Sequence, residues 1–80
     1  MTKDQIFTAV REVFRQVFRD PALEVTMSTT ANDIAEWDSL IHMHLIAAIE
    51  ERLNCEFSFN EVMNFESVGD MINKLAEKLS

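Results

Sequence analysis

The stretch SLIHMHLIAAIEERL, residues 39–53, decides the fold of this chain. Its apolar side chains recur at the spacing of an α-helix, so it predicts one long, strongly apolar helix. The residues before it, 22–37, contain no convincing periodic run. The serine at this junction, Ser39, can cap the helix, act as a nucleophile, or carry a covalently attached group. We favour the third role.

Three more helices are expected outside this stretch. The first covers residues 3–19 and the last covers 68–79, both with apolar residues at helical spacing. A short helix between them covers 59–64. Three residue pairs have the spacing of a capping box, which marks where a helix begins: Thr2 with Gln5, Ser58 with Glu61, and Ser67 with Asp70. The sequence therefore predicts an all-α fold over a single domain, residues 1–80. We expect a small four-helix bundle with three long helices, a short third helix and a long loop between the first two.

The loop of residues 22–37 is long for so small a domain. Loops of this length are usually functional or held down by their own side chains. We expect five apolar residues to hold it against the bundle: Leu23, Val25, Met27, Ile34 and Trp37.

The composition narrows the classes of partner. Fourteen acidic residues against seven basic ones give a net charge of −7. Binding to a phosphate backbone or to an anionic membrane requires positive charge, so we expect neither nucleic acid nor membrane as a partner. Basic protein surfaces are the natural complement. With no apolar secretory run and no transmembrane stretch, we expect a cytoplasmic protein. We also expect it to be a monomer.

The helix of residues 39–53 has two separate apolar faces. One face is formed by Leu45, Ile46, Ile49 and Leu53, and the other by Leu40, Met43 and Ala47. Either the helix is central and packs on both sides, or the second face stays exposed and receives a partner. Glu50 and Glu51 would then give that second face an acidic edge.

Asp38, Ser39 and His42 invite comparison with a catalytic triad. However, the chain has no Gly-x-Ser-x-Gly turn, because its only glycine is Gly69, and no oxyanion hole can be identified. We expect His42 to be a half-buried histidine whose hydrogen bonds are satisfied. His42 and His44 point in opposing directions on a helix, and the acidic residues lack calcium-loop spacing, so no metal is expected.

A covalently attached phosphate group suits the position of Ser39 better. The first turn of a helix presents unpaired amide donors and positive dipole potential, both of which favour a phosphodiester. A flexible arm anchored there could reach into the active site of another enzyme.

At these residues the chain resembles the acyl carrier protein family, which includes peptidyl and D-alanyl carrier proteins. Asp38-Ser39-Leu40 stands between a long loop and an apolar helix, and residues 67–72 follow in the order of the family. The resemblance implies a protein that is not an enzyme and that holds acyl or aminoacyl groups as thioesters on phosphopantetheine.

By the same resemblance, Ser39 is the attachment site, and Asp38 assists the phosphopantetheinyl transferase that installs the arm from coenzyme A. The partner-contacting positions of the family are matched by Leu40, Met43, Ala47, Glu50 and Glu51. The other partners implied are acyl-activating and acyl-transferring enzymes with basic surfaces.

The chain departs from fatty-acid carriers at a few positions. It has Glu36-Trp37 where they place glycine, and Ile41 and His44 where they carry acids. These differences, with the initial methionine and the compact length, favour a free-standing carrier in fatty-acid-like, polyketide or other specialised biosynthesis. The alternative is a helical adaptor that binds proteins and carries no prosthetic group.

Overall fold

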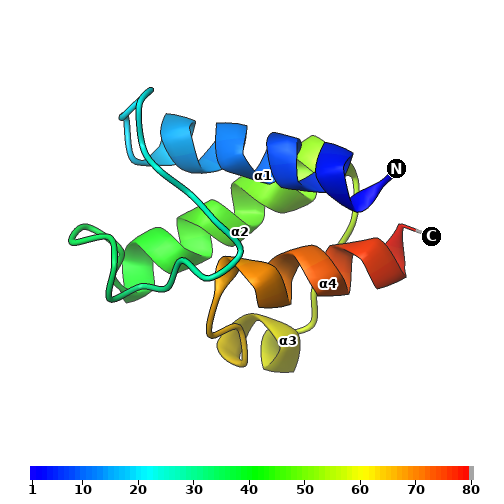
Figure 1. Ribbon diagram of the computed structural model, residues 1–80. Helices are drawn as coiled ribbons and strands as arrows, with labels where there is room; N and C mark the ends of the chain where they lie inside the picture. Colours follow the sequence, from blue (N-terminus) through cyan, green and yellow to red (C-terminus); the bar gives the residue numbers. More distant parts are fainter. Residues whose placement is uncertain (80) are drawn as a thin grey trace.

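The computed structural model describes residues 1–79 and contains four helices (Figure 1). They are α1 (Lys3–Val17), α2 (Ser39–Leu53), α3 (Phe59–Met63) and α4 (Val68–Lys78). No strand occurs among these described residues. The predicted all-α fold, with three long helices, a short third one and a long first loop, is confirmed.

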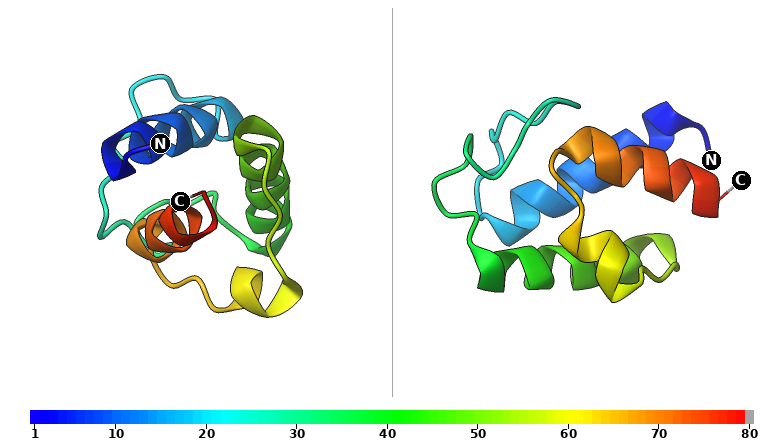
Figure 2. Two further views of the ribbon diagram at one scale, coloured as in Figure 1. Left: turned by 90° about the vertical axis from the view of Figure 1, so that its right-hand side faces the viewer. Right: turned by 90° about the horizontal axis from the view of Figure 1, so that it is seen from below.

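Helix α1 packs against both α2 and α4. The short helix α3 lies on the side opposite α1, between α2 and α4, and the start of α1 and the end of α4 lie at the same end of the bundle (Figure 2). The start of α2 is at the other end, next to the long loop (Figure 1).

The core is built from one apolar stripe on each long helix. From α2 it receives Leu45, Ile46 and Ile49, of which the first and last are fully buried. The side chains from α1 and α4 that complete it are Ile6, Val10, Val13, Phe14, Val68, Met71, Ile72 and Leu75. The predicted division of α2 into a core face and a second face is therefore confirmed on the core side.

The helix starts agree with the predicted capping boxes. All three boxes are formed, with reciprocal hydrogen bonds between the paired residues. The helix ends come slightly earlier than predicted. Helix α1 ends at Val17, because Phe18 is its C-cap and Arg19 takes a left-handed backbone conformation that cannot continue the helix. Asn64 and Leu79 act as C-caps instead of helical residues.

The long loop is held down by most of the expected side chains and by its backbone. Val25 and Ile34 are buried, while Leu23 and Trp37 pack against the core. The expectation for Met27 is wrong, because its side chain is 42% exposed. The backbone carbonyl of Met27 anchors the loop instead.

That carbonyl accepts a hydrogen bond of 2.8 Å from the Gly69 amide, and Thr29 O accepts one of 2.9 Å from the Val68 amide. The first amides of α4, which have no partner within the helix, are thus satisfied by the loop. A Cβ at Gly69 would lie 2.8 Å from Met27 O, which explains why the one glycine of the chain stands here.

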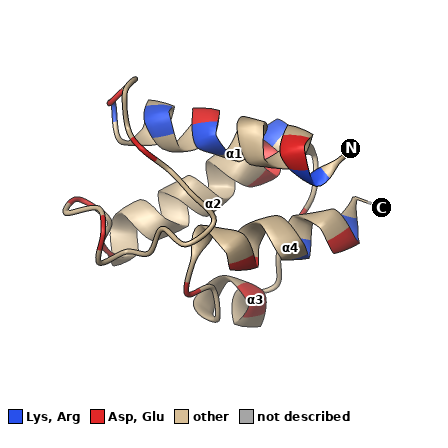
Figure 3. Ribbon diagram, in the orientation of Figure 1, with Lys and Arg blue, Asp and Glu red and all other residues tan. Residues whose placement is uncertain are grey.

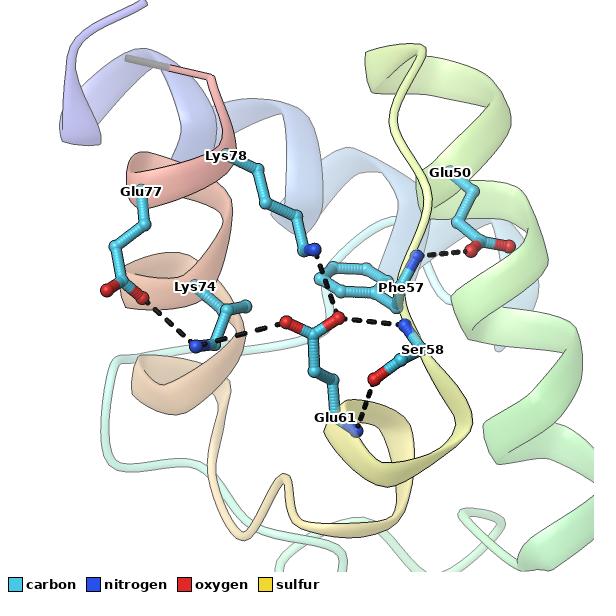
Figure 4. A network of polar contacts seen from close by, with 7 residues as sticks. All are labelled: Glu50, Phe57, Ser58, Glu61, Lys74, Glu77 and Lys78. Atoms are coloured by element: carbon cyan, nitrogen blue, oxygen red, sulfur yellow. Dashed lines mark hydrogen bonds and ion pairs between the residues drawn. The ribbon is translucent and has the colours of Figure 1, made fainter.

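Helix α3 contributes Val62 to the core, and polar contacts also join it and the segment before it to their neighbours (Figure 4). The Glu61 carboxylate accepts a hydrogen bond from the Ser58 amide at 2.8 Å and pairs with Lys78 Nζ at 3.0 Å. Lys74 Nζ lies 3.9 Å from the other Glu61 oxygen. On the α2 side, Glu50 Oε2 accepts a 2.8 Å hydrogen bond from the Phe57 amide.

The Glu61 contacts predict how stability changes with pH. The hydrogen bond from the Ser58 amide and the contact with Lys78 lower the pKa of Glu61 below its ordinary value. A carboxyl with a lowered pKa stabilises the fold above its unfolded pKa, about 4.3, and this contribution is lost as the pH falls through the folded pKa. Glu61→Gln should therefore have a lower Tm than the parent at pH 7, and the difference should shrink between pH 5 and pH 3. Glu56→Gln, at an exposed position, is the control; a pH-independent difference for Glu61→Gln would contradict the assignment.

The start of α2 gives a second prediction. Asp38 is the N-cap, and its Oδ1 accepts a 2.8 Å hydrogen bond from the Ile41 amide. Asp38→Ala should lower the free energy of unfolding by about 1 kcal/mol, whereas Asp38→Asn keeps a capping oxygen and should stay within a few tenths. Urea denaturation measures both. Equal stability of Asp38→Ala and the parent would show that the cap does not hold the helix start.

Candidate functional site

Ser39 is the first residue of α2 and is exposed. The residue before it, Asp38, takes the capping role. Of the three roles open to Ser39, capping is therefore already filled by its neighbour. Its hydroxyl lies at a rigid helix end where another protein can reach it.

The electrostatics at this helix end are mixed. The first amides of α2 point out of the helix and carry positive dipole potential. The Asp38 carboxylate already accepts a hydrogen bond from one of these amides, that of Ile41. A phosphodiester on Ser39 would share the helix end with this negative charge, so it fits best when it extends outward into solvent. The residues at the site are compatible with such a group.

The first three turns of α2 carry no Asp, Glu, Lys or Arg, as Figure 3 shows along the helix. The loop before the helix contributes acids at Glu36 and Asp38, and acids return only at Glu50 and Glu51. The surface next to Ser39 is therefore uncharged over its length and acidic at its two ends.

The geometry of His42 argues against a triad. Its Nδ1 accepts a 3.0 Å hydrogen bond from Trp37 Nε1, and its Nε2 lies 3.1 Å from Val62 O. Both ring nitrogens are occupied, so neither is available to take a proton from Ser39. The prediction of a half-buried histidine with satisfied hydrogen bonds is confirmed.

An open groove of about 620 Å³ runs from Ser39 between α2 and α3. Its walls are largely apolar, and Asp38 and Glu66 are the charged residues that line it. Its other lining residues are Ala31, Trp37, Ser39, His42, Met43, Phe59, Val62, Met63 and Phe65. A second hollow, of about 280 Å³, continues it toward Ala47 and Glu50 and shares Met43, Phe59 and Val62 with it.

The second face of α2 is exposed. Leu40 is 79% exposed and Met43 is 48% exposed, and Ala47 lies on the same surface. The interpretation that α2 packs on both sides is therefore wrong. Glu51 is also exposed, but Glu50 is half-buried, because its carboxylate holds the Phe57 amide.

Two exposed apolar residues next to the groove were not predicted from the sequence. Phe59 and Met63, both on α3, are 71% and 60% exposed. They stand four residues apart and so share a face of a helix, while Val62 between them is buried. That spacing was visible in the sequence, but α3 is too short to show which of its faces is buried.

Other candidate chemistry is weak. Burial raises the pKa of the half-buried Cys55 thiol, which disfavours a reactive thiolate. Within residues 1–79, no group of three or more His, Cys, Asp or Glu is placed to hold a metal ion. None of the helices described has both the length and the apolar character needed to span a membrane.

Known proteins have a similar sequence and a similar fold. Residues 8–75 match the family described as "Phosphopantetheine attachment site". The acyl carrier protein of Petrotoga mobilis is 30% identical over 80 residues, which cover 100% of this chain and 94% of that one. The acyl carrier protein of Acidothermus cellulolyticus is 28% identical over 95% of this chain and 90% of its own length.

A solved structure gives the same result. The holo acyl carrier protein from Geobacter metallireducens superimposes with a TM-score of 0.83 at 40% identity, over 90% of this chain and 83% of that one. The predicted cofactor, phosphopantetheine, and the prediction that the protein is a carrier and not an enzyme are confirmed by these relationships. The chain belongs to the acyl carrier protein family, whose members carry phosphopantetheine.

Proposed function

We propose that this chain is a free-standing cytoplasmic carrier that bears phosphopantetheine on Ser39 and holds acyl or aminoacyl groups on it as thioesters. The observation that carries the proposal is an exposed Ser39 at the first position of α2, at the mouth of the groove. Three relatives named acyl carrier protein support the carrier role, since the match covers 90% to 98% of their length.

Attachment requires a serine oxygen that another protein can reach. A phosphopantetheinyl transferase would join Ser39 Oγ to the phosphorus of the phosphopantetheine group, break the pyrophosphate bond of coenzyme A and release adenosine 3′,5′-bisphosphate. The serine proton would pass to the transferase. Asp38 lies beside Ser39, with Oδ1 committed to the Ile41 amide. The second oxygen of that exposed carboxylate is available to the transferase, and this is the assisting role we propose for it.

The surface around Ser39 is proposed to receive the partner enzymes. Leu40, Met43 and Ala47 form its apolar centre on α2, and Phe59 and Met63 extend it onto α3. Exposed apolar side chains that gather in this way are typical of protein-binding surfaces. The surface is bordered by acids, with Asp38 at one end and Glu51 at the other, so partners with an apolar contact region and basic edges fit it best.

Glu50 contributes differently from the other proposed contact residues. Its carboxylate is hydrogen-bonded to the Phe57 amide, where the chain turns toward α3. We propose that it shapes the partner surface by positioning α3 and that Glu51 supplies the accessible charge.

The proposed pathway is a specialised one: fatty-acid-like, polyketide, modified-sugar or amino-acid biosynthesis. Support comes from Ile41 and His44, which stand where fatty-acid carriers place acids. Trp37 is a second departure from the fatty-acid carriers, which place glycine in this region. Its ring packs edge-on against Phe14, with a centroid distance of 5.3 Å. Enzymes that recognise acids directly after the serine would find none here.

The attachment site can be tested by mass. After incubation with coenzyme A, magnesium and a broad-specificity transferase, the intact protein should gain one phosphopantetheine group, and Ser39→Ala should gain none. Ser28→Ala, at an exposed serine of the long loop, is the matched control and should be loaded like the parent. An unmodified parent beside an active carrier control would favour the adaptor that carries no arm.

The partner surface predicts a separation of binding from folding. Met43→Glu places a charge at the centre of the apolar surface, and the rate of loading by the transferase should fall about tenfold or more, equivalent to about 1.4 kcal/mol. Because Met43 is about half exposed, Tm should change by only a few degrees. Gln16→Glu, on the exposed surface of α1, is the charge-matched control. A large loss of Tm in Met43→Glu, with loading unaffected in the folded fraction, would place this residue in the core instead.

A further inference from the structure

His42 connects two segments that line the groove. Trp37, which donates to His42 Nδ1, belongs to the loop two residues before Ser39. Val62, whose carbonyl lies at His42 Nε2, belongs to α3. The indole and imidazole rings are also stacked, with a centroid distance of 5.9 Å and an interplanar angle of 23°. The His42 side chain, on α2, therefore contacts both the loop that precedes Ser39 and helix α3.

These two hydrogen bonds require one protonation state. The indole N–H of Trp37 can only donate, and the carbonyl of Val62 can only accept. The imidazole must therefore be neutral, with its proton on Nε2 and a lone pair on Nδ1. A protonated imidazole carries N–H groups on both nitrogens, so the hydrogen bond from Trp37 is lost.

Helix α3 makes this contact through Val62, the only buried residue of its five. The Val62 carbonyl belongs to the last turn of a short helix, where no further turn supplies an amide partner. The Glu61 contacts with Lys74 and Lys78 hold α3 to α4, and the Glu50 contact holds the segment before it. The His42 contact joins α3 itself to α2 by a hydrogen bond, in addition to the packing of the Val62 side chain in the core.

We propose that neutral His42 is a positioning residue, which keeps the loop before Ser39 and helix α3 in place beside the groove, and that its protonation releases the loop at Trp37. The role of this arrangement in loading rests on the proposed function of Ser39. The coupling of His42 protonation to the position of Trp37 does not.

The charged groups that line the same groove as His42 are both acidic. They are Asp38, from the turn that begins α2, and Glu66, from the segment after α3. On the α1 side, Trp37 meets the uncharged rings of Phe14 and Phe18. Among residues 1–79, no Lys or Arg side chain and no residue of α4 lines this groove.

Trp37 reports directly on the arrangement, because it is the only tryptophan and its indole N–H gives one isolated signal in a proton–nitrogen correlation spectrum. Histidine ordinarily changes charge between pH 5 and 8. In the unmodified parent protein, the indole signal should move as the pH is lowered from 8 to 5, toward the position of an indole without a protein hydrogen bond. In His42→Gln, whose amide can accept from Trp37 and donate to Val62 without titrating, the signal should stay in place.

The other histidine is the matched control. His44→Gln, at an exposed position on the same helix, should show the full pH-dependent shift. An unmoved signal in the parent, or a shift that persists in His42→Gln, would overturn the proposal.

Hydrogen exchange tests the contact with α3. At pH 8 the amides of residues 59–63 should exchange severalfold faster in His42→Leu, which cannot donate to Val62 O, than in the parent and in His42→Gln. Equal rates in the parent and His42→Leu would overturn the proposed positioning of α3. Neither measurement uses the arm, so either can fail while Ser39 is still loaded.

Loading then tests the positioning role. At pH 8, His42→Leu removes both hydrogen bonds and should be loaded severalfold more slowly than the parent, whereas His42→Gln should restore loading to within about twofold. Circular dichroism confirms that each variant is folded. Equal loading of the folded His42→Leu variant and the parent would show that His42 does not position the site.

Discussion

The hydrogen bond from the Ile41 amide to the Asp38 carboxylate fixes where α2 begins. Because Asp38 is the cap, Ser39 becomes the first helical residue, with its side chain in solvent and its backbone held by a rigid element. A start one residue later would make the serine itself the capping group and occupy its hydroxyl. The accessibility of that hydroxyl, on which the proposed carrier role depends, thus follows from one local choice of cap.

The second constraint is that α2 buries only one of its two apolar faces. Leu45, Ile46 and Ile49 complete the core with α1 and α4. The opposite face has no long helix against it, and only the five residues of α3 lie beside it. An open apolar groove therefore begins at Ser39 and runs along α2. Side-chain contacts from His42, Glu50 and Glu61 hold α3 in position beside this groove.

Much of this arrangement could be predicted from the sequence, because the signals are local. Capping boxes marked the starts of α1, α3 and α4 correctly, since a cap depends on residues three apart. The core face of α2 followed from periodicity. The contact between Met27 O and Gly69 could not be predicted, because it joins backbone atoms that are distant in the sequence. The hydrogen bond between Glu50 and the Phe57 amide, and the one between His42 and the Val62 carbonyl, depend on where α3 packs. No local sequence pattern specifies that position.

The proposed carrier role requires that Ser39 bears the prosthetic group in the living cell. Peptide mapping by mass spectrometry of the protein purified from its natural host can detect that group. We expect phosphopantetheine, free or acylated, on the peptide that contains Ser39, with fragment ions that place it on that residue. An unmodified Ser39 throughout the purified protein, or the same group on a different side chain, would rule out the proposed attachment site.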